Sequence, residues 1–196
     1  YQLVVSSWHQ GRGAPWVVHC PETVVPVIES TMAAWRDERA QRVAFEKRPS
    51  ATGLQVETRL LKPGRRIRIG DMEIEPVSVD HGPVRPAYGL VFRSAGKTAV
   101  VSGDTRPSDA LIAAGKGADL LVHEVFIHRD MLPVPGKRSP ATIEAVASYH
   151  TLSSEVGAVA RSMGAARLAL THFVPPDFDR EALLAEVGES FEGPVH

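Results

Sequence analysis

The sequence predicts an α/β (α+β) fold, in which sheets are covered by helices on their outer faces, and two observations support it. Between 53 and 101, apolar residues recur at every second position, as in half-buried strands separated by short turns. After Lys97, the pattern changes to strand-like runs that alternate with helical stretches. The strand-like runs lie at 98–102, 119–123 and 167–171, and the helical stretches at about 108–116, 140–149, 153–163 and 179–190.

The first 60 residues complete this order of elements. Residues 2–9 predict a helix or turn, and 16–20 a buried strand. Apolar residues at spacings of three and four from Pro21 to about Phe45 predict one amphipathic helix with a proline near its first turn. Turn residues at 62–64, 70–71 and 94–96 then divide a meander of antiparallel strands.

Composition and charge limit the class of protein. The chain has 196 residues, 43% of them apolar, and we expect a single domain over 1–196. A formal net charge of -1 gives no general attraction for a polyanion. No apolar run approaches the roughly 20 residues of a membrane span, and no secretory leader is present, so we expect no membrane partner. The single cysteine, Cys20, excludes a multi-cysteine zinc site and fits a cytoplasmic location.

Polar residues follow several of the predicted strands, where layered folds usually place their sites. They are His81, Asp104, Glu124 and His172. Imidazoles with one carboxylate form a ligand set that zinc, manganese or iron accepts. Each residue alone has a structural alternative, since a histidine at a strand end is more often hydrogen-bonded than a ligand. The Asp104 segment could equally form an Asx turn that caps the next helix.

Five segments in order resemble the later motifs of ribonuclease Z-like proteins, a branch of the metallo-β-lactamase superfamily. They are Asp80-His81-Gly82-Pro83-Val84 with Ala87-Tyr88-Gly89, Val101-Ser102-Gly103-Asp104-Thr105-Arg106, Ala118-Asp119-Leu120-Leu121-Val122-His123-Glu124, Tyr149-His150-Thr151, and Leu170-Thr171-His172-Phe173. The resemblance implies an αββα sandwich that is incomplete at the N-terminus and at the C-terminus. It also covers most of the chain from Trp16 onward.

The resemblance also implies the roles of these residues. His81 and His172 would each bind one of two divalent metal ions, and Asp104 would bridge both. Zinc is the first choice, with manganese or iron as alternatives. His150 would act as the general acid, with Glu124 orienting it, although an ordinary salt bridge explains Glu124 equally well. Thr151 or Ser153 would cap the helix that follows His150.

The family's His-x-His-x-Asp-His motif is absent from the sequence, so we expect a fragment whose metal site is incomplete and which is inactive by itself. The long arm with which ribonuclease Z grips tRNA is also absent, because Ser94-Ala95-Gly96 joins the two strands directly. The expected protein is therefore a phosphodiesterase that uses a dinuclear metal-bound hydroxide with Asp104 and His150. Its expected substrate is a small phosphodiester or ester rather than RNA. Three alternatives stay open: a tRNA 3′ processing endoribonuclease, a carboxylic or sulfate ester hydrolase, and a non-catalytic fragment. The oligomeric state is also open, a homodimer included.

Overall fold

The computed structural model describes all residues from 1 to 196, which form two compact units, 1–62 and 63–196. Helices and mixed sheets confirm the predicted α+β class. The single domain over 1–196 stays a prediction, because compactness alone does not distinguish a lobe from a domain. None of the helices combines the length and the apolar character that crossing a membrane requires.

The first unit packs helices against a small sheet around Val4, Val5, Trp8 and Leu54. Its helices are α1 (Gln2–His9), α2 (Val25–Ala34) and α3 (Arg36–Glu46), with the short 3-10 turns η1 (Glu22–Val24) and η2 (Thr52–Leu54). Its two strands, β1 (Trp16–Cys20) and β2 (Val56–Leu60), run parallel.

Two sequence-based predictions for this unit are wrong. The single helix predicted up to Phe45 is broken at Trp35, whose backbone leaves the helical region and whose ring stacks on Tyr1 at 4.5 Å. The strand at 56–60 does not belong to the antiparallel meander, because it pairs with β1 instead. Alternating residues predict that a strand exists but do not identify its partner, which packing decides.

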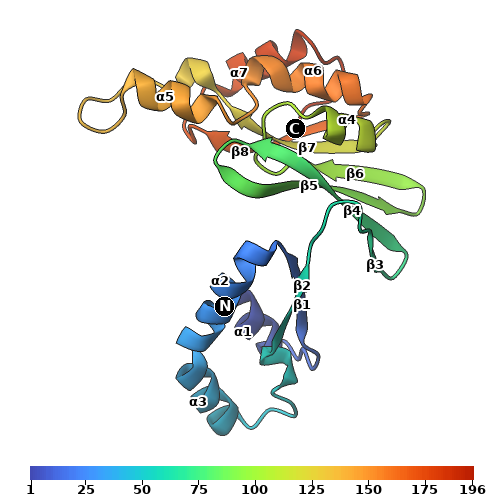
Figure 1. Cartoon of the computed structure of the whole chain (residues 1–196), viewed down its shortest axis with the longest axis vertical. Coiled ribbons are helices and arrows are strands. Elements are labelled where there is room, and N and C mark those ends of the chain that lie inside the picture. The colour runs from blue at the N-terminus through green and yellow to red at the C-terminus, as the bar shows by residue number, and fades with distance from the viewer. The chain divides into compact units, whose positions relative to one another are not determined.

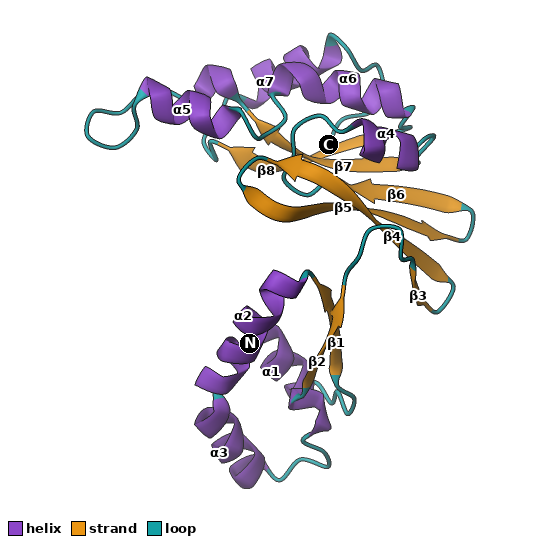
Figure 2. Cartoon of the chain, viewed as in Figure 1, coloured by secondary structure: helices purple, strands orange, loops and turns teal.

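The second unit is built on a six-stranded sheet in which neighbouring strands follow chain order (Figure 2). The strands are β3 (Ile67–Ile69), β4 (Met72–His81), β5 (Val84–Ser94), β6 (Lys97–Val101), β7 (Leu120–Phe126) and β8 (Leu168–Val174). Strands β3 to β6 are antiparallel, whereas β6, β7 and β8 are parallel. Because β4 and β6 both run opposite to β5, strands β4, β6, β7 and β8 all end at the same edge of the sheet.

The connection between β5 and β6 is as short as a hairpin allows. Ser94 pairs with Lys97, and only Ala95 and Gly96 lie between them. Both have positive φ, 49° and 72°, which is the type I′ geometry that matches strand twist. This is the tight hairpin that the sequence predicts.

Helices cover one face of this sheet (Figure 1). They are α4 (Asp109–Ala114), α5 (Pro140–Ala147), α6 (Ser153–Met163) and α7 (Arg180–Gly188), and a 3-10 turn, η3 (His128–Asp130), follows β7. The core between sheet and helices contains fully buried residues of both, such as Val91, Val100, Leu121, Val156 and Met163. This core fixes the strand ends from which the polar residues project.

Candidate functional site

The shared edge of the sheet brings together side chains that are up to 91 positions apart in the sequence, from His81 to His172. His81 is the last residue of β4, and Asp104 follows β6 after a short turn. Glu124 and His172 lie within β7 and β8, not after them as the sequence suggested. Both strands are longer than predicted, because they continue pairing through Val125 with Phe173 and Phe126 with Val174.

A bulge in β8 sets the direction of His172. Thr171 pairs with Glu124 and Phe173 with Val125, so His172 is an extra residue with no partner on β7. Its φ of 49° lies in the left-handed region, which is uncommon for a residue with a Cβ. A bulge of this kind redirects a side chain out of the strand's normal alternation. The imidazole of His172 consequently faces Asp104.

One oxygen of Asp104 faces two imidazoles. Its Oδ2 lies 3.9 Å from His81 Nε2 and 3.6 Å from His172 Nε2. Both distances exceed ordinary hydrogen-bond lengths. Two ligand atoms of one tetrahedral zinc, each at about 2.1 Å, are separated by roughly 3.4 Å. The spacing and the donor types therefore fit residues that hold a divalent metal.

A hydrogen bond at Nδ1, the ring nitrogen that does not face Asp104, fixes the orientation of His81. Its Nδ1 lies 3.1 Å from the main-chain oxygen of Tyr149, and its side chain is largely buried. A carbonyl oxygen can only accept, so Nδ1 donates to Tyr149 and Nε2 is the ring nitrogen that faces Asp104. Metal-binding histidines usually have a hydrogen bond of this kind.

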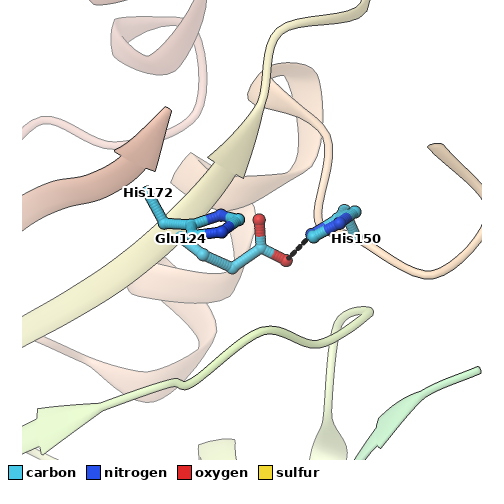
Figure 3. Close-up of side chains that lie close together, drawn as sticks. All are labelled: Glu124, His150 and His172. Carbon is cyan, nitrogen blue, oxygen red and sulfur yellow. Dashed lines mark hydrogen bonds and ion pairs between the residues drawn. The ribbon is translucent and has the colours of Figure 1, made fainter. Parts of the chain in front are cut away.

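Glu124 lies at the centre of a buried hydrogen-bond network, and Figure 3 shows its bond with His150. Only 1% of its surface is exposed, and its Oε1 accepts three bonds. The donors are His150 Nδ1 at 3.1 Å, Thr105 N at 3.1 Å and Thr151 N at 3.0 Å. Glu124 therefore holds the ring of His150 and, through the two threonines, the backbone beside Asp104 and beside His150.

A second grouping of possible ligands consists of Glu124, His150 and His172, whose nearest ligand atoms all lie within 4.8 Å of one another. It fits a metal less well than the Asp104 set. Oε1 of Glu124 and Nδ1 of His150 are already bonded to each other, so Glu124 could offer a metal only its buried Oε2 and His150 only its Nε2. The geometry is that of an orienting carboxylate beside a histidine whose Nε2 stays free.

Two groups next to the site have shifted pKa values. The hydrogen bond from Arg106, helped by one from Gly82 N, holds the pKa of Asp80 below its usual value. Burial lowers the pKa of His123, although its contacts with Glu124 oppose this effect. His123 is thus a neutral residue of the interior, as its apolar sequence surroundings suggest.

Three positions in the network were not found from the sequence. Thr105 and Thr151 are linked directly, because the side-chain Oγ1 of Thr151 donates to the main-chain oxygen of Thr105 at 2.7 Å. Tyr149 acts through its backbone oxygen, which no sequence pattern reveals.

The prediction that Thr151 or Ser153 caps α6 is wrong. Leu152 is the N-cap, and Glu155 accepts its N–H at 3.0 Å, a bond whose signal was the glutamate three residues on.

Comparison with known proteins now identifies the family. Residues 6–173 match the model of the Beta-lactamase superfamily domain, which is most of the chain. The chain belongs to this family. Membership in the beta-lactamase superfamily supports hydrolase chemistry, and its metallo-β-lactamase fold implies that a divalent metal is bound, which agrees with the donors around Asp104.

Curated relatives in this superfamily include ribonucleases Z. The ribonuclease Z of Mycobacterium tuberculosis H37Rv is 28% identical over 176 residues, which cover 88% of this chain and 63% of the relative. That of Myxococcus xanthus is 40% identical over 123 residues, which cover 62% of this chain and 37% of the relative. The chain thus spans between one third and two thirds of the length of these relatives.

Solved structures share the metallo-β-lactamase fold. The fold protein YhfI of Bacillus subtilis has a TM-score of 0.59 and 25% identity, covering 80% of this chain and 58% of that one. Human tRNase Z, short form, has a TM-score of 0.53 and 17% identity, covering 81% and 60%. The predicted resemblance to the ribonuclease Z-like branch and the predicted fold are both confirmed.

Proposed function

We propose that this chain forms most of a metal-dependent phosphodiesterase in which His81, Asp104 and His172 bind metal and His150 is the general acid. The observation that carries the proposal is the position of Asp104 Oδ2, 3.9 Å and 3.6 Å from the Nε2 atoms of two histidines on different strands. Near these ligands, His150 is held by a buried carboxylate.

In this proposal His150 is the proton donor and Glu124 orients it. His150 donates its Nδ1 proton to Glu124, which fixes the ring and leaves Nε2 to pass a proton to the departing oxygen. The ring of His150 lies close to those of His81 and His172, with centroids 4.9 Å and 5.7 Å away. A proton donor in this position acts on a group bound at the metal ligands.

The metal would supply the remaining chemistry. Two divalent ions, when bound, lower the pKa of a water and stabilise negative charge on the phosphate oxygens. We propose zinc because the donors are imidazoles and a carboxylate, and manganese or iron suits the same set. Asp104 would serve both ions, and the approach of one of its oxygens to both histidines supports this role.

We favour a small phosphodiester or ester as the substrate. The two-residue turn of Ala95 and Gly96 leaves no space for an inserted RNA-gripping arm between β5 and β6. The second candidate is endonucleolytic tRNA processing, which the similarity to curated ribonucleases Z over 88% of the chain favours. Cleavage of a small phosphodiester and tRNA processing both break a phosphodiester bond, so these two reactions would use the same residues.

The general acid is tested by His150→Ala in the full-length protein. We expect kcat on bis(p-nitrophenyl) phosphate to fall by roughly 100-fold or more, because a positioned acid contributes about that factor. The matched control is His128→Ala. His128 also pairs with a glutamate, Glu144, at 2.9 Å, but it lies on the surface outside the network, so its loss leaves the rate unchanged. An unchanged rate in His150→Ala overturns the assignment.

The reaction class is tested by substrate comparison and metal analysis. Higher activity on bis(p-nitrophenyl) phosphate than on p-nitrophenyl acetate or p-nitrophenyl sulfate supports the phosphodiesterase, and the reverse order supports an ester hydrolase. Faster cleavage of a tRNA precursor than of the small phosphodiester favours the second candidate. Protein that binds no divalent metal contradicts an enzyme of either kind and supports a non-catalytic role.

A further inference from the structure

We propose that Asp80 is a positioning residue that ties the end of β4 to the loop after β6 and thereby sets the spacing between His81 and Asp104. This inference rests on the proposed function, because it takes both residues as metal ligands. It assigns a role to a side chain that faces no ligand atom itself.

The need for such a tie follows from the order of the strands. His81 ends β4 and Asp104 follows β6, but β5 lies between these strands. No ladder of main-chain hydrogen bonds can therefore join the two segments directly. Their ligand atoms nevertheless lie 3.9 Å apart, a spacing that some other contact has to maintain.

Asp80 provides this contact with both its backbone and its side chain. Its main-chain oxygen accepts Arg106 N at 2.9 Å and Thr105 Oγ1 at 3.3 Å. Its carboxylate accepts Gly82 N at 3.0 Å through Oδ1 and pairs with the guanidinium of Arg106 through Oδ2. One residue thus bonds to the backbone just after His81 and to the two residues that follow Asp104.

An irregularity in the sheet makes these contacts available. Val79 pairs with Ala87 and His81 with Val84, so Asp80 faces two residues of β5, Arg85 and Pro86, instead of one. A bulge leaves main-chain groups out of the ladder and bends the strand. The freed oxygen of Asp80 reaches the loop after β6 across the end of β5. The Arg85 guanidinium, with its Nη2 3.9 Å from Oδ1, adds a second positive charge beside the carboxylate.

The test is a titration of the metal-free full-length protein with Co²⁺, followed by its visible absorption, which reports the ligand geometry and is independent of turnover. For Asp80→Asn we expect the dissociation constant for Co²⁺ to rise by about 10- to 100-fold, as is usual when a residue that orients ligands is lost. The absorption bands should also shift. Asparagine has only one side-chain oxygen, so either Gly82 N or Arg106 meets an amide nitrogen instead of an acceptor.

Asp119→Asn is the matched control. Asp119 is 41% exposed in its side chain, against 45% for Asp80. It also pairs with a cation, Lys97 at 2.6 Å, and accepts a backbone N–H, Thr98 N at 2.9 Å. Asp119 precedes β7, at the opposite strand ends from the site. Its variant should lose similar thermal stability yet keep the affinity and spectrum of the wild type.

Arg106→Gln supplies a second test on an exposed side chain in case Asp80→Asn does not fold. It breaks the same ion pair, so the affinity for Co²⁺ should fall by a similar factor. The double variant, Asp80→Asn with Arg106→Gln, should bind Co²⁺ no more weakly than the weaker of the two single variants. His81→Ala separates the two proposals. If the wild type binds no Co²⁺, or His81→Ala binds it equally well, the proposed metal site is wrong. If His81→Ala loses Co²⁺ but Asp80→Asn and Arg106→Gln match Asp119→Asn, only the role of Asp80 is overturned.

Discussion

Replacement of Glu124 tests whether one buried carboxylate holds the network together. In Glu124→Ala, three donors lose their acceptor, namely Thr105 N, Thr151 N and His150 Nδ1. Each buried donor left without a partner costs about 1–3 kcal/mol, so the free energy of unfolding should fall by at least ~3 kcal/mol. Glu124→Gln keeps an oxygen for these donors but weakens the bonds and buries an amide where Oε2 has no partner. Its expected loss is about 1–2 kcal/mol.

Urea unfolding followed by far-UV circular dichroism measures both losses. The tryptophans, Trp8, Trp16 and Trp35, all belong to the first unit, whereas Glu124 belongs to the second. Amide hydrogen exchange gives a local check, because Thr105 and Thr151 should lose protection in Glu124→Ala and largely keep it in Glu124→Gln. The reasoning is refuted if the alanine variant loses less than about 1 kcal/mol, or if both variants lose the same amount.

Two further predictions concern the surroundings of the site. Gly103→Ala should lower the free energy of unfolding by roughly 2–4 kcal/mol, since φ is +61° and the added Cβ would lie 2.6 Å from Tyr88 O. Gly117→Ala, with φ +74° and open space around the Cβ, should lose only about 1–2 kcal/mol in the same denaturation assay, and equal losses would contradict the steric argument. Burial lowers the pKa of His123, so the unfolded chain takes up a proton first as the pH falls below about 6.5. Its contribution to stability is complete above that pH and is lost below it, down to the folded-state pKa, at up to about 1.4 kcal/mol per pH unit. Urea midpoints of metal-free wild type and His123→Asn from pH 7.5 to 5.5 should therefore converge toward low pH, and a constant difference would count against this explanation.

The sequence by itself determined the kind of local structure in the second unit and the residue types of its site. Period-two alternation and turn residues such as Ala95 and Gly96 depend on only a few neighbouring residues in the sequence. They therefore predict local structure without knowledge of which distant segment packs against it. The five ordered motifs indicated the family and selected His81, Asp104, Glu124, His150 and His172 as site residues. Their roles stay proposals, but these side chains do lie together in the fold.

Tertiary structure alone decided what depends on distant partners. Local pattern could not show that β2 pairs with β1, that the long helix breaks where Trp35 stacks on Tyr1, or that a bulge turns His172 toward Asp104. The sequence does not reveal the roles of the backbone oxygens of Tyr149 and Asp80, because every residue has a backbone oxygen. Which carbonyl the ring of His81 or the amide of Arg106 meets is fixed only when strands and loops from separate parts of the chain pack together.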